Sequence, residues 1–173
     1  MISIRTERTN DVTAREALLD EAYGPSRFRK SSEKIRRGRQ PADHLALIAV
    51  DGQRLVGTVR LWHVACGDKP ALLLGPVAVA CDRQGEGIGS ALVRRAIDAA
   101  RAHGHNAIVL VGDAPYYGRF GFSAEKTGTL AMPGPFERHR LLGLELVPGS
   151  LDGAAGVIAA TGRPVIRTRR KAA

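Results

Sequence analysis

The chain has 173 residues, of which 44% are hydrophobic and 25% are charged, and its formal net charge is +9. This length suffices for one domain with its own core, and the composition excludes a disordered or fibrous protein. The charge leaves three classes of partner open, namely nucleic acid, an acidic surface and a polyanionic small ligand.

The first quarter of the chain predicts a strand, a helix and a strongly basic stretch. Residues 2–7, ISIRTE, alternate apolar and polar side chains as a strand does. Residues 10–24, NDVTAREALLDEAYG, predict a helix that begins with Asn10 or Asp11 as its capping residue and ends at Gly24. The stretch 26–40, SRFRKSSEKIRRGRQ, carries seven basic residues and one acid, with a short helix expected near 33–37.

Three strands are expected next. The stretch HLALIAVDGQRLVGTVRLWHVA predicts two strands joined at Asp51-Gly52, since Asp-Gly between apolar runs is a strong hairpin signal. The run ALLLGPVAVA predicts a third strand, which is apolar on both faces and therefore central in a sheet. Gly75-Pro76 interrupts it. Because proline cannot donate to a ladder, the strand must bulge or part from a neighbour there.

The second half begins with a glycine-rich loop, RQGEGIGSAL, at residues 83–92. A helix follows from Ile88 with Gly104 as its C-terminal cap, and NAIVLVGD is another buried strand. Strand, loop, helix and strand in this order predict a right-handed crossover between two parallel strands. APYYGRFGF predicts a short helix or turn, and HRLLGLELV a last strand.

The fold class predicted from these elements is α/β, with a mixed, mostly antiparallel central sheet flanked by helices. We expect a single domain over residues 1–150 and a C-terminal extension, 151–173, that ends in a basic and mobile tail. The opening MISIRTERTND lacks the apolar core of a signal peptide, and no apolar run is long enough to span a bilayer, which predicts a cytoplasmic protein without a membrane partner. Cys66 and Cys81 form no CxxC pair and are expected to be reduced thiols.

The glycine loop is an expected anion site, because the first amides of a helix lack partners and carry partial positive charge. A nucleoside triphosphate loop would need a lysine that this loop lacks. A dinucleotide fingerprint fits Gly85 and Gly87, with Ser90 in place of the third glycine and Asp113 as the acid. However, the sixty residues that remain contain one clear strand rather than further strand-helix units. Coenzyme A is the third ligand class.

The order Gln84-x-x-Gly87-x-Gly89 resembles the central motif of the GNAT superfamily, the Gcn5-related N-acetyltransferases. LGPVAVACD precedes the loop as a strand does in that family, and YYGRFGF matches its Tyr-x-x-x-Gly-Phe pattern with Tyr117. The resemblance covers residues 2–147 and extends to a group of small bacterial predicted N-acetyltransferases. It implies an acyl-CoA N-acyltransferase fold whose sheet is splayed between two central parallel strands.

The resemblance also implies roles for individual residues, with acetyl-CoA as co-substrate and no metal. The backbone of Val77 and Val79 would pair with the pantetheine arm. Tyr117 would protonate the leaving sulfur, with Tyr116 as the adjacent alternative. Arg83 is either a further phosphate contact or a solvated charge. The pyrophosphate would lie on the loop amides, and the residues concerned are Gln84, Gly85, Gly87, Ile88, Gly89 and Ser90.

A general base is not evident from the sequence. Members of the family often have a glutamate on or near the strand before the loop, whereas ALLLGPVAVA contains no carboxylate. The nearest candidates by segment are His63, Asp68, His44 and Glu21.

The function implied is acetyl transfer to a primary amine of a small molecule or a protein, by direct attack in a ternary complex. The alternative is a CoA-binding sensor or scaffold without catalysis. Nucleic-acid binding is disfavoured, since only 5% of residues are aromatic and no basic segment interleaves stacking side chains. Either a monomer or a homodimer is compatible with the family. If stretch 26–40 shapes the acceptor side, as the corresponding segment of the family often does, its charge would disfavour polyamines.

Overall fold

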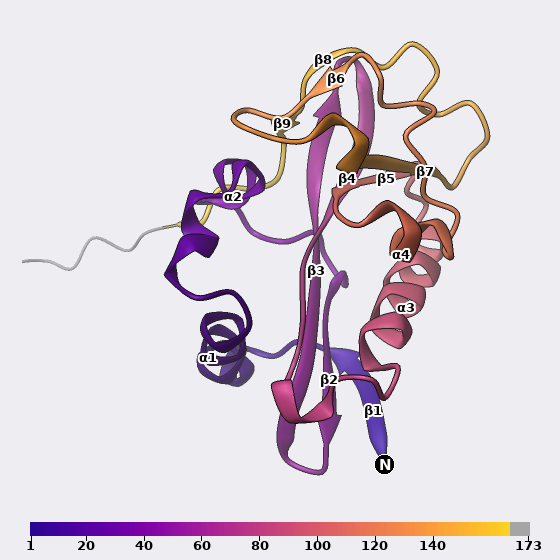
Figure 1. The fold of residues 1–173 in the computed structure, drawn as a ribbon. Helices are drawn as coiled ribbons and strands as arrows, with labels where there is room; N and C mark the ends of the chain where they lie inside the picture. Colours follow the sequence, from indigo (N-terminus) through magenta and orange to yellow (C-terminus); the bar gives the residue numbers. More distant parts are fainter. Residues whose placement is uncertain (167–173) are drawn as a thin grey trace, which may run out of the picture.

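The protein, described over residues 1–166 by a computed structural model, is built on one mixed β-sheet (Figure 1). Neighbouring strands follow the order β1-β2-β3-β4-β5-β7, and the short β9 pairs with β3. Every neighbouring pair in this sheet is antiparallel except β4 and β5. The strands are β1 (Ile2–Thr6), β2 (Ala46–Asp51), β3 (Arg54–Cys66), β4 (Lys69–Val79), β5 (Ala107–Val111), β7 (Leu141–Glu145) and β9 (Ala159–Ala160), beside a small separate pair, β6 (Leu130–Ala131) with β8 (Gly156–Val157).

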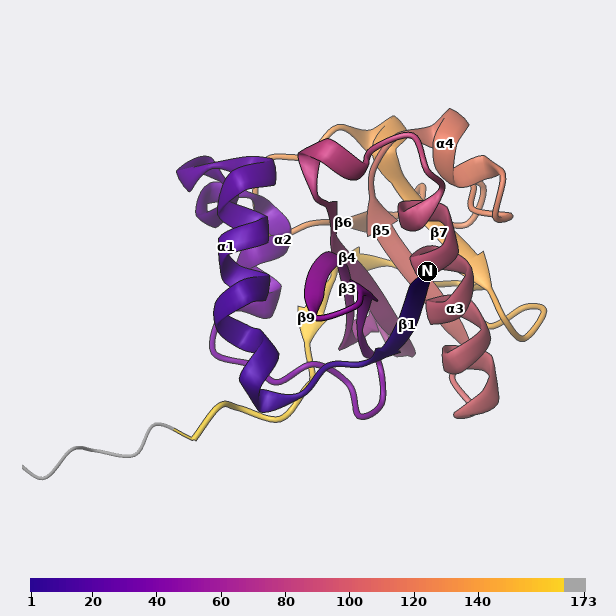
Figure 2. The same cartoon turned by 90° about the horizontal axis from the view of Figure 1, so that it is seen from below.

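Helices cover both faces of this sheet. In the two views, α1 (Val12–Tyr23) and α2 (Ser31–Arg36) lie on one side, and α3 (Ile88–Ala102) lies on the other (Figures 1 and 2). The fourth helix, α4 (Ala114–Gly118), follows β5. This arrangement confirms the predicted α/β class and the parallel crossover from β4 through α3 to β5.

The two long helices begin and end close to the predicted positions. The carboxylate of Asp11 accepts the backbone N–H of Arg8 and pairs with Arg5, so it closes the preceding turn rather than capping α1. Gly24, at φ 67°, ends α1. In α3 the buried face includes Val93, Ile97 and Ala100, so it is wider than the row of Ile88, Leu92, Ala96 and Ala99 that periodicity indicates.

The sheet opens at the middle of β4. Strands β4 and β5 pair at Leu72 with Ile108 and at Leu73 with Val109, and β4 then continues to Val79 without β5. The register between β3 and β4 also shifts, opposite Gly75-Pro76. The indole N–H of Trp62 donates to the carbonyl of Gly75 at 2.6 Å, which satisfies a buried group within the irregular stretch. The Gly-Pro pair therefore marks the point where the sheet splays, as predicted.

The packed fold continues past the boundary expected at residue 150. Leu151, Ala154 and Ile158 are almost fully buried in a core they share with Trp62 and Leu73. Residues 156–160 also contribute β8 and β9. Residues 151–160 are thus part of the same hydrophobic core rather than an appendage, and the sequence periodicity was too short there to predict it. The basic tail that we expected to be mobile lies, from residue 167 on, outside the described residues.

Candidate active site

Two cavities meet at the splay of the sheet. We refer to them as the loop cleft, of about 450 Å³, and the basic cavity, of about 460 Å³. Val77 and Tyr117 line both, so the two spaces adjoin at the end of β4 and at α4. The loop cleft is lined by Val77, Ala78, Val79, Arg83, Gln84, Gly85, Gly87, Ile88, Gly89, Ser90, Tyr116 and Tyr117.

The glycine loop forms the floor of the loop cleft and the start of α3. Gly85 and Gly87 have φ values of +83° and +80°, which side-chain-bearing residues rarely adopt. A Cβ on either glycine would meet no atom within 4 Å, so the loop presents bare backbone to open space. The first amides of α3 lack intrahelical partners and lie at the positive end of the helix dipole. All nine residues that the sequence assigned to cofactor binding line this one cleft, which can hold a phosphate group.

The backbone of β4 beyond the splay runs along the cleft. Val77 and Val79 pair with β3 on one side, opposite Val59 and Gly57. On the other side the pairing with β5 has already ended. Tyr23 is the last residue of α1, and its hydroxyl donates to the carbonyl of Val77. Sequence reasoning missed this contact, because nothing in the local pattern of α1 indicates which strand its end will reach.

Tyr117 is held between α4 and the core. The carboxylate of Asp113 accepts the N–H of Tyr116 at 3.1 Å and caps α4. The ring of Tyr117 packs edge-on against Phe122, with ring centroids 6.0 Å apart. It also lies against Gly112, where an added Cβ would come within 2.5 Å of the ring. A glycine at this position is therefore what lets the ring occupy the junction of the two cavities.

The hydroxyl of Tyr117 holds its proton firmly. Burial raises its pKa well above the usual value, and the neighbouring Tyr23 and Tyr116 raise it further. A free tyrosine has a pKa close to that of a thiol, and burial makes the hydroxyl of Tyr117 a weaker acid than that. It therefore remains a hydrogen-bond donor throughout the neutral range.

Tyr116, the alternative acid, lies wholly on the loop side. Its hydroxyl is 3.3 Å from the Oγ of Ser90, and the guanidinium of Arg119 lies over its ring at 4.4 Å. Arg119 also donates to the Oγ of Ser90 at 3.0 Å, which brings a cation to the start of α3. Sequence reasoning missed Arg119, although it lies within YYGRFGF. Of the two tyrosines, Tyr117 alone borders both cavities.

Arg83 lines the cleft but is engaged elsewhere. Its guanidinium donates to Asp51 at 2.7 Å and to Glu86 at 2.7 Å. These hydrogen bonds raise the pKa of Arg83, and the hydrogen bond to Glu86 has the larger effect. The side chain is therefore tied to the β2–β3 turn and to the loop itself, and a phosphate would have to compete with two carboxylates for it.

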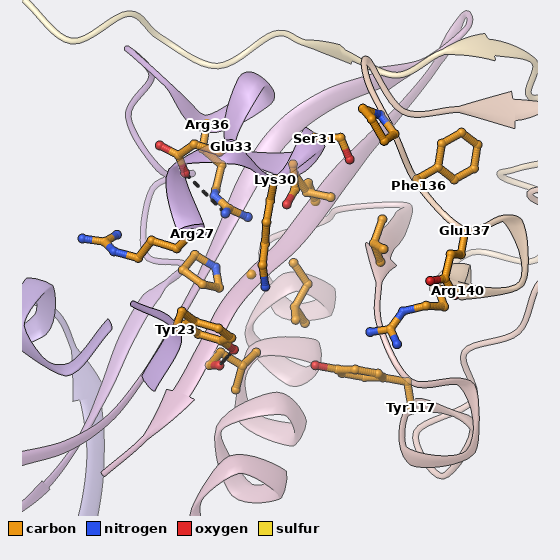
Figure 3. A pocket seen from close by; sticks show the side chains of 18 residues that line it. Tyr23, Arg27, Lys30, Ser31, Glu33, Arg36, Tyr117, Phe136, Glu137 and Arg140 are labelled. Atoms are coloured by element: carbon orange, nitrogen blue, oxygen red, sulfur yellow. Dashed lines mark hydrogen bonds and ion pairs between the residues drawn. The ribbon is translucent and has the colours of Figure 1, made fainter. Parts of the chain in front are cut away.

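The basic cavity takes three cations from the predicted basic stretch, namely Arg27, Lys30 and Arg36 (Figure 3). The side chain of Arg36 is 9% exposed and pairs with Glu33 at 3.4 Å. Arg27 pairs with Glu16 and Asp20, which lie outside the cavity. The full lining is Tyr23, Arg27, Lys30, Ser31, Ser32, Glu33, Arg36, Leu73, Leu74, Gly75, Pro76, Val77, Val111, Tyr117, Pro135, Phe136, Glu137 and Arg140.

The four base candidates from the sequence line neither of these cavities. His63 borders a third, smaller space beside Asp43 and Arg163, and His44 stacks on His103 at 4.8 Å. Asp68 lies in the turn before β4, and Glu21 contacts Cys81. The carboxylates at the basic cavity are instead Glu33 and Glu137. No sequence pattern around Glu33 or Glu137 indicates that they lie at this cavity, because each reaches it from a segment remote from the glycine loop.

Residues 1–166 show neither a metal-binding cluster nor a membrane-spanning helix. That part of the chain has no group of three or more His, Cys, Asp or Glu side chains arranged to hold a metal ion. None of its helices combines the length and the apolar character needed to cross a membrane. Cys66 is buried, which raises the pKa of its thiol to about 11, and Cys81 is exposed; both are free thiols.

A protein-family model described as acetyltransferase (GNAT) family matches residues 12–122. An uncharacterized N-acetyltransferase of Escherichia coli, YjhQ, is 35% identical over 77 residues. That stretch is 42% of this chain and 42% of the relative, so the match spans less than half the length of that curated relative.

Solved structures are similar over more of the chain. The crystal structure of the GNAT family N-acetyltransferase YhbS from Escherichia coli, in complex with CoA, is similar with a TM-score of 0.78 and 25% identity, over 92% of this chain and 89% of that one. A GNAT family acetyltransferase from Brucella melitensis, in complex with acetyl-CoA, has a TM-score of 0.59 and 29% identity, over 83% and 96% of the two chains.

Proposed function

Because this chain belongs to the GNAT acetyltransferase family, we propose that it is an N-acetyltransferase that moves the acetyl group of acetyl-CoA to a primary amine. One observation carries the proposal: the loop cleft and the basic cavity adjoin at Val77 and Tyr117. A two-substrate transfer requires two binding spaces that share one reacting point. The complexes of the similar proteins with CoA and acetyl-CoA support the choice of cofactor.

Coenzyme A would lie along the loop cleft. Its pyrophosphate would accept hydrogen bonds from the amides of the glycine loop, with Arg119 and Ser90 beside it. The pantetheine arm would add to the free edge of β4 at Val77 and Val79, as a short strand adds to a sheet. This path ends at the junction of the cavities, so the thioester would reach Tyr117.

The transfer itself would be direct. A neutral amine in the basic cavity attacks the thioester carbonyl, so that a C–N bond forms and a tetrahedral oxyanion develops. Backbone N–H groups at the splayed β4 stabilise that oxyanion. On collapse the C–S bond breaks and the hydroxyl of Tyr117 protonates the sulfur, which leaves as a thiol; the proton that the amine nitrogen loses as it becomes an amide restores the tyrosine hydroxyl.

The acceptor's ammonium group must first lose a proton, and Glu137 is the carboxylate we propose as the base. Glu33 is committed to Arg36 at 3.4 Å, whereas the one ion-pair partner of Glu137 among residues 1–166 is the exposed His139. Glu137→Gln should therefore lower kcat at least about tenfold at pH 7 and less at high pH. An equal loss at every pH would point to a structural role instead.

A CoA-binding sensor without catalysis is the second candidate, because the loop cleft would serve that role equally well. Thiol release from acetyl-CoA in the presence of an amine panel separates the two. An N-acetyltransferase releases thiol only when an acceptor is present. A sensor binds acetyl-CoA and releases none, and an unrelated protein shows no acetyl-CoA affinity at all.

A further inference from the structure

Three cations reach the basic cavity from two segments that lie far apart in the sequence (Figure 3). Lys30 precedes α2, Arg36 lies in its last turn, and Arg140 lies just before β7. Lys30 and Arg140 both point into the space that Tyr117 enters (Figure 3). Arg36 lies at the splay itself, since its Nη1 is 3.6 Å from where a Cβ of Gly75 would be.

These cations are close enough to repel one another. Burial lowers the pKa of Lys30, and the charges of Arg36 and Arg140 lower it further. The ammonium group of Lys30 lies 4.4 Å above the ring of Tyr23, which fixes it over the cavity rather than in bulk solvent. The protein thus holds like charges together at a cost in free energy.

The nearby carboxylates leave part of this charge uncompensated. Glu33 is paired with Arg36, and Glu137 is paired with His139 at 3.4 Å. Within residues 1–166, Lys30 and Arg140 take part in none of the ion pairs that the structure forms. Two cations that face one small cavity without a carboxylate partner are suited to an anion supplied by the substrate.

We propose that the acceptor is a small primary amine that carries an anionic group, a carboxylate or a phosphate, bound by Lys30, Arg36 and Arg140. The inference rests on the proposed function and names the substrate class of that same site. Guanidinium groups match the paired oxygens of carboxylates and phosphates, and the ammonium group of Lys30 adds a third cationic donor. With its anion held there, the amine end of the acceptor can extend toward Tyr117 and the thioester.

Size and charge disfavour the other acceptor classes. A cavity of about 460 Å³ lies in the lower half of the range of about 300–1,000 Å³ for small-molecule sites. It therefore fits an amino-acid-sized amine better than a folded protein surface. A polyamine would bring a second cation into a space that already holds an excess of them, which costs binding energy. The apolar side chains of Leu73, Val111 and Phe136 would contact the acceptor's carbon skeleton.

Matched acceptor pairs test this proposal. Thiol release from acetyl-CoA is measured with β-alanine against β-alaninamide, L-leucine against L-leucinamide, and O-phosphoethanolamine against ethanolamine, with spermidine beside them. Rates are compared per unprotonated amine, since the amides have lower ammonium pKa values. The anionic member of at least one pair should have a kcat/KM about tenfold higher or more. The first two pairs test for a preference for a carboxylate on the acceptor, and the third tests for a preference for a phosphate.

Variants of the cations assign the effect to this cavity. Lys30→Met and Arg140→Gln should each lower kcat/KM for the preferred anionic acceptor about tenfold and leave its neutral partner within about twofold. Lys34→Met is the matched control, because Lys34 is an exposed cation of α2 that does not line the cavity, and it should change neither member of the pair. Acetyl-CoA affinity should be unchanged in all three variants.

The possible results separate the two proposals. Turnover that favours the amides or spermidine, or equal losses for both members of a pair in Lys30→Met and Arg140→Gln, overturns the anionic acceptor and leaves the N-acetyltransferase intact. If no amine supports turnover, binding of N-acetyl-L-leucine and N-acetyl-L-leucinamide to the enzyme–CoA complex decides, and equal binding overturns the inference. Absence of acetyl-CoA binding contradicts the proposed function itself.

Discussion

The loop cleft and the basic cavity are similar in volume but are built in opposite ways. Ten of the twelve residues that line the loop cleft come from one stretch, residues 77–90, joined by Tyr116 and Tyr117 of α4, and the groups this stretch offers a ligand are mainly backbone amides and glycines. The basic cavity is made from side chains of α1, α2, β4, β5 and the chain before β7, which lie far apart in the sequence. The backbone groups of the loop cleft suit one kind of ligand group, whereas single side-chain changes in the basic cavity can alter its specificity without altering the fold.

This contrast also decides what the sequence could predict. The nine residues assigned to the cofactor line one cleft because a contiguous loop and strand carry their geometry with them. Gly75-Pro76 likewise marked the splay, since proline cannot continue a ladder. Tyr117 lies within a few residues of β5 and could be placed from its motif.

Features that depend on tertiary contacts were not predictable in this way. The base candidates were chosen by proximity in sequence, and none of them lines the two cavities. The contact of Tyr23 with Val77 joins residues 54 positions apart. The backbone of Arg140 is held beside the end of β5, because the N–H of Gly112 donates to the carbonyl of Arg140 at 2.9 Å. This contact joins segments that are far apart in the sequence. Periodicity within one element carries no information on such pairings.

The largest expected effect comes from blocking the loop cleft. Gly87→Val should lower acetyl-CoA affinity at least about 100-fold, because a branched side chain would fill the space at the start of α3 where several charge-assisted hydrogen bonds form. Isothermal titration with acetyl-CoA measures this. Gly104→Val is the matched control, since Gly104 also has φ +80° and open space around its Cβ position but lies at the other end of α3. Equal loss of affinity in both variants would assign the effect to backbone strain.

Removal of one oxygen at the junction should affect turnover alone. Tyr117→Phe should retain acetyl-CoA binding and lose about 100-fold in kcat, the usual contribution of a general acid. Since burial raises the pKa of Tyr117, the acid stays protonated to higher pH than a free tyrosine. The kcat of the unaltered enzyme should therefore not fall between pH 7 and about 10. Unchanged turnover in Tyr117→Phe would remove this residue as the acid.

A smaller effect should follow from displacing the same ring. Gly112→Ala places a Cβ within 2.5 Å of the ring of Tyr117, so the ring must shift away from the junction. We expect a decrease of about tenfold in kcat, in line with the sensitivity of transfer reactions to small misplacements. The test is a double-mutant cycle: if the glycine acts by placing the hydroxyl, Gly112→Ala adds little to Tyr117→Phe. Fully additive losses would indicate an independent effect on the fold.

The smallest effect is expected at Arg83. Its guanidinium is held by Asp51 and Glu86, so little of its hydrogen-bonding capacity is left for a phosphate. Arg83→Gln should therefore raise the KM for acetyl-CoA about threefold or less. A far larger increase would show that Arg83 leaves its carboxylate partners to contact a phosphate, and the loop cleft would then depend on a side chain as the basic cavity does.

Initial-velocity kinetics with acetyl-CoA and an amine varied together test the central claim most directly. If the two cavities hold both substrates at once, double-reciprocal lines intersect, and no thiol is released until the amine is present. Mass spectrometry of the protein after incubation with acetyl-CoA alone should then find no acetylated enzyme. Parallel lines together with an acetyl group on the protein would contradict direct transfer across the junction of Val77 and Tyr117.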